Sequence, residues 1–486
     1  MRRYTTKFAR FGRLSLNALA VLALSLALGV TASTNASAQV TLDEVNYDWL
    51  HREWERFLPR ESNCVWPTYY VDENAGRGGD GSREHPFATL AEALAASADP
   101  AVCGPTVILF PGRYEIGRLV MEKPTILRGH LGTTIVASIL NVSALPLWLE
   151  EIILADAPFP GAVFAAHPEG ETTLVQVEIS RATGFGLLLH GGLLEMSDSR
   201  IEASRAGDTA QAARMIGELA SMLPRTGPYV PSHLDSLQEA VDALPDGVLG
   251  PSLSPDFTVK VQPDLVALLV KCSGTGLYVS GGAHVILSGA TNYFVDNDRA
   301  GLVATDLATY VEGHDVYTQS NGISGLPPVS DNEIYLLESG YCLGGIQVRQ
   351  KAFVNLTGVN SSGNNYYGVI VHHGGMSFFN GLATFTNTDL FDIGLGHGMI
   401  GFDGSLAAQN FGSHLNERSG IIIQSTSQFY LSNGQSTQNR YGVISDVCDI
   451  ENYLAQHNVT VSGNTEMDIT LLPGCPLPIP TPPPLP

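Results

Sequence analysis

Four residues in the last third of the chain have the side chains that acid–base chemistry needs. Arg349, His372, His373 and Asp403 each follow a short, mostly apolar segment that a glycine opens. If these segments are stacked strands, about 4.8 Å apart, an arginine, a histidine and an aspartate would form a row within about 10 Å. A cation, a base and an acid serve proton abstraction beside a carboxylate, or hydrolysis of a glycosidic bond. The alternative is that all four are solvated turn residues.

The segments in front of these residues belong to a repeat. Their opening glycines are spaced by 23, 30, 22 and 22 residues, so one unit is about 22 residues long, with one insertion. Self-similarity at such a period is typical of a solenoid, in which each unit buries its apolar face only against its neighbours. The opening glycines are Gly345, Gly368, Gly398, Gly420 and Gly442, preceded by Gly186, Gly276 and Gly301.

The local pattern indicates which solenoid this is. Short β-branched or aromatic runs such as Ile421–Ile423 are separated by serine, asparagine and glycine clusters, which predicts strands and turns. The leucine-rich consensus and helical spacing are absent, so we predict a parallel β-helix of about a dozen coils. A β-sandwich with glycine-rich turns is the alternative. Asparagines late in the units are expected to hydrogen-bond along the stack: Asn364, Asn387, Asn410 and Asn433.

Segments near the N-terminus resemble the first coils of a known group of proteins. These segments are 69–72, 86–90, 107–114 and 124–129, and the group is the secreted right-handed parallel β-helix proteins of the pectin-lyase-like superfamily. The likeness extends from about Tyr69 to about Asn464. It implies a right-handed fold but no particular reaction, because the superfamily holds lyases, hydrolases, epimerases, phage tailspikes and proteins of no known reaction.

The resemblance also implies where a site would lie. Carbohydrate-active members of the superfamily build their sites on the outer face of a sheet, from residues of adjacent coils. The row of Arg349, His372, His373 and Asp403 fits that place. The Asn-Thr-Asp and Asp-Asp motifs of polygalacturonases and the arginine-bearing lyase motif are absent from this sequence.

The N-terminus predicts export. Residues 1–38 contain five basic residues, an apolar run from Leu14 to Val30 and a small-residue cleavage site at 36–38, which predicts a cleaved signal peptide and a secreted or periplasmic protein. No later apolar run is long enough to span a membrane. The chain has 26 basic and 48 acidic residues, a net charge of −22, and removal of the leader makes it about −27. Such a surface disfavours nucleic acid and anionic membranes, whereas it could hold calcium.

Three further segments lie outside the repeat. A helix at 41–58, within a capping region at 39–68, is expected to cover the N-terminal coil. Residues 203–270 interrupt the β-helix of 69–470 with two amphipathic helices, at 209–223 and 232–244, which predict a helical hairpin. The hairpin is either a lid over a cleft or a shield over an apolar stripe. This apolar stripe on the outer face of the coils consists of Leu188, Tyr278, Val303, Ile370, Ile400, Ile422 and Ile444.

A proline-rich tail at 471–486 ends the chain.

Six cysteines in an exported chain favour disulfides, although six allow fifteen pairings. We predict Cys64 with Cys103 and Cys448 with Cys475, which leaves Cys272 with Cys342. Residues 296–298 resemble a fragment of a calcium loop but lack its remaining ligands.

These patterns predict an all-β, right-handed parallel β-helix with a helical N-terminal cap and a helical-hairpin insertion. Its expected partner is a polysaccharide on the outer face, with a lyase or glycoside hydrolase site as one hypothesis. A non-catalytic surface or matrix scaffold is the other hypothesis. Convergent, accessible polar residues would favour the first.

Overall fold

A computed structural model describes residues 64–223, 229–251, 267–323, 341–389, 395–424 and 426–472. The chain divides into two compact units, Met1–Arg60 and Glu61–Pro486, and the fold described below is that of the second. The predicted signal peptide at 1–38, the helix at 41–58 and the tail from 473 onward lie outside the described residues, so they stay predictions.

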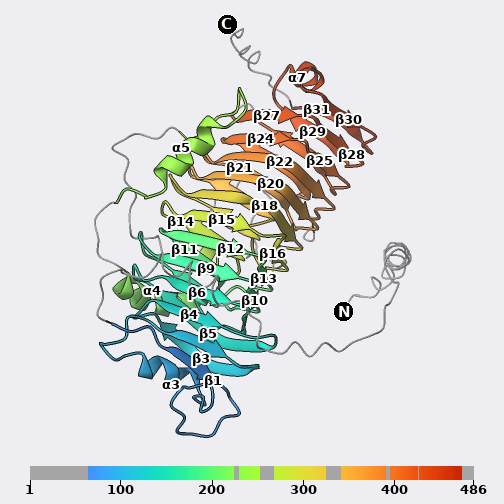
Figure 1. The fold of residues 1–486 in the computed structure, drawn as a ribbon. Coiled ribbons are helices and arrows are strands. Elements are labelled where there is room, and N and C mark those ends of the chain that lie inside the picture. The colour runs from blue at the N-terminus through green and yellow to red at the C-terminus, as the bar shows by residue number, and fades with distance from the viewer. Residues whose placement is uncertain are drawn as a thin grey trace, which may run out of the picture. The chain divides into compact units, whose positions relative to one another are not determined.

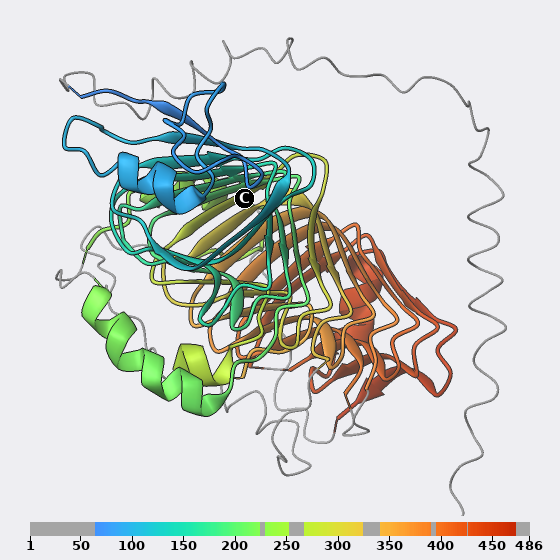
Figure 2. The ribbon, with the colours of Figure 1, turned by 90° about the horizontal axis from the view of Figure 1, so that it is seen from below.

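Three ladders of parallel strands run along the second unit (Figure 1). Each strand pairs with the strand one coil before it and the strand one coil after it. We number the ladders in the order in which the chain visits them within a coil. The successive coils overlap when the stack is seen from below (Figure 2).

The first ladder contains β1 (Thr68–Val71), β2 (Thr106–Leu109), β4 (Thr125–Arg128), β6 (Leu147–Glu150), β9 (Glu171–Val175), β12 (Leu193–Ser197), β15 (His284–Ser288), the first halves of β18 (Tyr310–Gln319), β20 (Phe353–Ser362) and β22 (Met376–Phe385), then β24 (Ser405–Gln409) and β27 (Gln428–Ser432). The second contains β3 (Gly112–Val120), β5 (Thr133–Asn141), β7 (Ile153–Ala155), β10 (Glu178–Ser180), β13 (Arg200–Glu202), β16 (Asn292–Val295), the second halves of β18, β20 and β22, then β25 (Gly412–His414), β28 (Gly434–Thr437) and β30 (Val459–Ser462). The third follows from the end of β5 through β8 (Gly161–Ala165), β11 (Phe185–His190), β14 (Leu277–Ser280), β17 (Leu302–Ala304), β19 (Ile346–Arg349), β21 (Tyr367–His372), β23 (His397–Phe402), β26 (Ser419–Ile423), β29 (Tyr441–Ser445) and β31 (Met467–Leu471).

The glycine-led repeat of the sequence is the third ladder. Its register aligns Ile346, Val369, Met399, Ile421 and Val443 in one column, and all five side chains are fully buried. Inward-facing residues of all three ladders form one continuous apolar core. Burial of each large aliphatic side chain favours folding by about 1.5–3 kcal/mol. The predicted parallel β-helix is therefore confirmed by the strand register.

Buried asparagines form a ladder at the turn between the second and third ladders of strands. The side-chain Oδ1 of each member after the first accepts a hydrogen bond from the backbone N–H of the asparagine one coil earlier, at 2.9–3.3 Å. Asn364 and Asn387 belong to this ladder, as predicted. Asn410 and Asn433 do not, because they lie at the corner between the first and second ladders, exposed, with φ of 54° and 50°. The members are Asn297, Asn321, Asn364, Asn387, Asn416, Asn439 and Asn464.

The insertion contains two helices at the predicted places, α4 (Thr209–Met222) and α5 (Leu234–Asp242). Both lie outside the coils, at different heights of the stack (Figure 1). Leu219 of α4 packs in one apolar cluster with Leu188 and Tyr278, whereas Leu237 of α5 packs in another with Tyr310. The helices are thus present, but the predicted hairpin is not confirmed. Helix α4 covers part of the apolar stripe.

Three shorter helices and two disulfides complete the described unit. Helix α3 (Leu90–Ala96) starts with a capping box between Thr89 and Glu92, η1 (Ala267–Lys271) precedes β14, and α7 (Ile450–Gln456) precedes β30. The structure confirms the disulfides Cys64–Cys103 and Cys272–Cys342. Cys448 is also disulfide-bonded, but its predicted partner, Cys475, lies outside the described residues. Among the described helices, none combines the length and the apolar character needed to cross a bilayer.

Candidate functional site

The structure places the backbones of the four sequence-predicted site residues close together. Arg349 at the end of β19 pairs in register with His372 at the end of β21, and His372 pairs with Phe402 of β23. Asp403 follows Phe402 directly. The residues therefore lie on three successive coils, as their spacing predicts.

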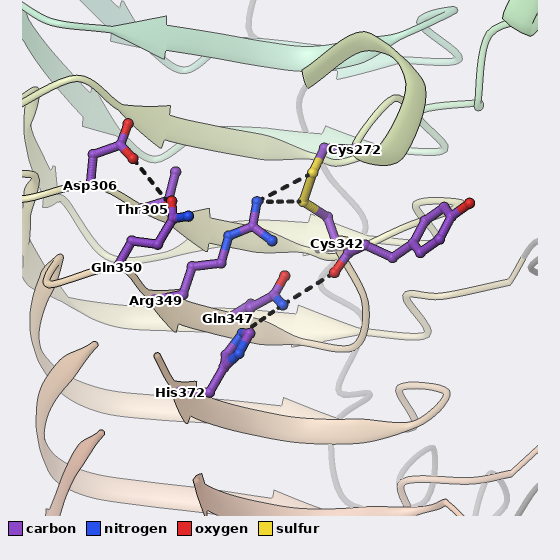
Figure 3. Close-up of a disulfide and its surroundings, with 9 residues drawn as sticks. Cys272, Thr305, Asp306, Cys342, Gln347, Arg349, Gln350 and His372 are labelled. Atoms are coloured by element: carbon purple, nitrogen blue, oxygen red, sulfur yellow. Dashed lines mark hydrogen bonds between the residues drawn. A yellow bond between two sulfur atoms is a disulfide. The ribbon is translucent and has the colours of Figure 1, made fainter. Parts of the chain in front are cut away.

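Their side chains, however, have different surroundings. Arg349 is 7% exposed and His372 is fully buried, whereas His373 is half-buried and Asp403 is exposed. Arg349 points toward the disulfide, with Nη2 3.6 Å from the sulfur atoms of both Cys272 and Cys342 (Figure 3). A polysaccharide at the surface could reach Asp403 and part of His373, but not the other two side chains.

His372 points toward Gln347 rather than outward (Figure 3). Its Nε2 lies 2.9 Å from Gln347 Nε2, and its Nδ1 lies 2.7 Å from His373 Nδ1. Gln347 in turn donates to the Tyr341 carbonyl oxygen at 3.2 Å. Burial, with the neighbouring Arg349 cation and His373, holds the pKa of His372 well below its usual range. His372 is therefore a neutral imidazole, buried on the third ladder and in contact with Gln347 and His373.

A second group of polar side chains lies on the outer face of the first ladder, and its glutamates are half-buried or exposed, whereas its histidine and tyrosine are buried. We call it the carboxylate–histidine face: Glu171, Glu195, His284, Tyr310 and Glu312. It arises from strand alternation, since inward neighbours such as Leu194 and Met196 are fully buried. Register places His284 beside Tyr310, and Ile286 between Glu195 and Glu312.

Hydrogen bonds and ring stacking fix the part of this face on β15 and β18. His284 Nε2 lies 2.7 Å from Glu312 Oε1, and Tyr310 Oη donates to Glu312 Oε2 at 2.9 Å. The rings of His284 and Tyr310 stack with centroids 5.1 Å apart. The Glu312 side chain remains 35% exposed, so this carboxylate is both oriented and accessible.

The ionisation of the face is uneven. Burial, helped by the negative charge of Glu195, raises the pKa of Glu171 to about 7. Burial alone would raise the pKa of Glu312 too, but hydrogen bonds from His284 and Tyr310 bring that pKa below its ordinary value. Near neutral pH the face therefore offers a carboxyl group that can donate a proton beside carboxylates that can accept one. Such a separation is how proteins assign acid and base roles to like groups.

The insertion borders this face. The ring of His233, just before α5, stacks on His284 with centroids 4.8 Å apart, and its Nε2 lies 2.9 Å from the Ala308 carbonyl oxygen. Tyr229 Oη donates to the carbonyl oxygen of Gly281. Burial lowers the pKa of His233 to about 4. Helix α5 is thus anchored to the coils beside the carboxylate–histidine face.

The described residues contain no group of three or more histidine, cysteine, aspartate or glutamate side chains placed to hold a metal ion. The fragment at 296–298 has another role. Asn297 belongs to the asparagine ladder, and Asp298 accepts hydrogen bonds from Ala206 N and Arg205 Nη1 at 2.8 and 3.0 Å.

Sequence reasoning missed the carboxylate–histidine face. The glycine pairs 191–192 and 281–282 precede β12 and β15, but Ala283 is an extra residue after the second pair. Alignment on these pairs is therefore one residue off the observed register, in which Leu193 pairs with His284 and Glu195 with Ile286. The insertion of 203–270 hides this relation, because it separates two neighbouring coils by a long stretch of chain.

No family profile and no curated protein matches this sequence. Several solved structures are similar in fold. They include pectate lyase Pel9A, 12% identical over 84% of this chain and 80% of that chain, with a TM-score of 0.34. The A-modules of the mannuronan C-5 epimerases AlgE6 and AlgE4 of Azotobacter vinelandii are 13% and 12% identical. They cover 80% and 84% of this chain and 95% and 98% of their own, with TM-scores of 0.42 and 0.41. The fold assignment accordingly rests on the strand register described above.

Proposed function

We propose that this chain is a right-handed β-helix protein of the pectin-lyase-like type that binds a polysaccharide across the outer face of its first ladder. The observation that carries the proposal is the juxtaposition of Glu171 and Glu195 on neighbouring coils. Glu171 lies opposite Leu193 in register, two residues before Glu195, so their Cα atoms are about 8 Å apart. Burial and the charge of Glu195 raise the pKa of Glu171 to about 7, so this carboxyl group is partly protonated near neutral pH, and Glu195 is exposed.

This arrangement suits attack on a glycosidic bond. Glu171 would donate its proton to the leaving oxygen, while Glu195 or Glu312 would act as the base or stabilise positive charge on the sugar. Glu312 lies two coils beyond Glu195, at about 10 Å along the stack. The histidine and tyrosine that hold Glu312 keep its carboxylate turned toward the same face. The non-catalytic alternative, a secreted scaffold, shares the binding face but does not need the acid–base pair.

The test is a screen of the purified protein against neutral and acidic polysaccharides, reading binding, new reducing ends and unsaturated uronate absorbance. We expect cleavage that disappears in Glu171→Gln and Glu195→Gln and persists in Asp403→Asn, the matched control at the row predicted from sequence. Cleavage lost only in Asp403→Asn would overturn the proposed site. Binding with no cleavage in the unmodified protein would favour the scaffold.

A further inference from the structure

A groove of about 430 Å³ opens at the exposed corner between the first and second ladders, near the C-terminal end of the stack. Asn410, Asn433 and Gln435 line it, together with Leu382, Phe411 and the small residues Gly381, Ala383 and Gly412, which we call its floor. All three amides belong to exposed residues. The small residues leave the space, and the amides give it a polar rim.

Backbone conformation explains why asparagine occupies this corner. Asn410 and Asn433 have φ of 54° and 50°, a left-handed conformation that asparagine tolerates better than most residues. Asn410 Nδ2 donates to Asn380 Oδ1 at 2.9 Å, and Asn458 Nδ2 donates to Asn433 Oδ1 at 3.1 Å. Each of these bonds uses one end of an amide that lines the groove, and the Oδ1 of Asn410 and the Nδ2 of Asn433 have further hydrogen-bonding capacity.

The chemistry of the lining is uncharged. None of the residues that line the groove is acidic or basic, although the chain carries a net charge of −22. Amide groups donate and accept hydrogen bonds equally well, which matches sugar hydroxyl groups. A uronate carboxylate, in contrast, would find no cation among these residues.

The groove continues the surface of the proposed site. Its amides follow β24 and β27, which lie beyond β18 on the same ladder (Figure 1). From Glu312 on β18 to the end of β24 is three coils, about 15 Å along the stack. Asn410 and Asn433 are one coil apart, a rise close to the length of one pyranose ring.

We infer that this corner is a binding subsite for uncharged sugar units of an oligosaccharide that lies along the stack. The inference rests on the proposed polysaccharide function, whose substrate class it narrows. The amides of Asn410, Asn433 and Gln435 bond the hydroxyl groups of successive sugars, and the small floor residues accommodate the rings.

The test is calorimetric titration of the full chain with neutral glucose-based and mannose-based oligosaccharides and with oligouronates. Asn410→Asp and Asn433→Asp are isosteric and keep a residue type that accepts positive φ, but each replaces donors by charge. Gln435→Ala removes an amide, and Ala383→Tyr fills the floor. We expect about tenfold weaker binding of the neutral oligosaccharide in each amide variant and loss of binding in Ala383→Tyr.

Gln438→Glu is the matched control, because Gln438 is also exposed with φ of 59° but does not line the groove. It should bind as the unmodified protein does. Unchanged neutral-sugar affinity in the groove variants, with cleavage still lost in Glu171→Gln, would overturn the subsite and leave the proposed function standing. Absence of binding to every oligosaccharide would overturn both.

Discussion

The substitution Asn387→Ala tests what holds successive coils together. The Asn387 side chain is fully buried and sits in the middle of the asparagine ladder. Its Oδ1 accepts from Asn364 N at 3.0 Å and from Asn364 Nδ2 at 3.3 Å. Its Nδ2 donates to Asn416 Oδ1 at 2.8 Å and more weakly to the Ser361 carbonyl oxygen at 3.4 Å. The backbone of Asn387 has ordinary φ, so alanine removes these bonds without adding strain.

The expected loss follows from these contacts. Each hydrogen bond contributes about 1 kcal/mol net, and a buried N–H left without an acceptor costs about 1–3 kcal/mol. Because the longer bonds contribute less, we expect the free energy of unfolding to fall by about 3–5 kcal/mol. That is a large share of the roughly 5–15 kcal/mol that stabilises a typical domain.

The assay is urea denaturation at pH 7, followed by far-ultraviolet circular dichroism. Asn360→Ala is the control, because Asn360 is a half-buried asparagine on the outer face of the second ladder. It should change stability by less than about 1 kcal/mol. Equal effects of the two substitutions would refute the view that the ladder, rather than asparagine content in general, couples the coils.

Three further predictions follow from the same structure. Because the folded-state pKa of Glu171 is raised to about 7, folding stability should fall as pH rises from about 4.5 through 7. The substitution Glu171→Gln should remove that loss of stability, which is measured by comparing urea midpoints at pH 5 and pH 8. His233 has a folded-state pKa lowered to about 4, so its contribution is present above about pH 6.5 and lost as pH falls toward 4. The protection factors of the α5 amides, which correct for the intrinsic pH dependence of hydrogen exchange, should fall over that range, and less so in His233→Gln. The disulfide Cys272–Cys342 joins cysteines 70 residues apart, so the double substitution to serine should lower the free energy of unfolding by about 4 kcal/mol in chemical denaturation. An unchanged free energy of unfolding would mean that this disulfide does not stabilise the fold.

The fold could be predicted from sequence because each coil of the third ladder begins with the same glycine-led apolar segment. The column through Val369, Met399 and Ile421 is visible as a spacing before any coordinate is known. The asparagines show where spacing stops being sufficient. Asn410 and Asn387 recur at similar intervals, yet one lies at an exposed corner and the other inside the stack. A period fixes which residues stack on one another, not which corner of the coil they occupy.

The candidate site was less predictable for a related reason. Spacing placed Arg349 and His372 on adjacent strands correctly, but it does not tell how deeply their side chains are buried. Cys342 and Cys272 come from segments that precede two different coils, and their disulfide covers Arg349. The catalytic role of Arg349, His372, His373 and Asp403 stays a prediction. Glu171 and Glu312 escaped notice because the insertion splits the coils that bring them onto one face.

The asparagine ladder has a consequence for how such a chain can change over evolutionary time. From Asn364 to Asn439, the backbone N–H of each ladder asparagine donates to the Oδ1 of the asparagine one coil later, so the coils of this part are equivalent at this corner. Excision of residues 420–441 would join Ser419 to Gly442, set Gly442 in the place of Gly420 and bring Asn416 onto Asn464, with the pairing of all remaining strands in phase. Duplication would lengthen the stack in the same way. The length of the stack therefore changes in whole coils. The length of polymer that can lie along its face changes by the same steps.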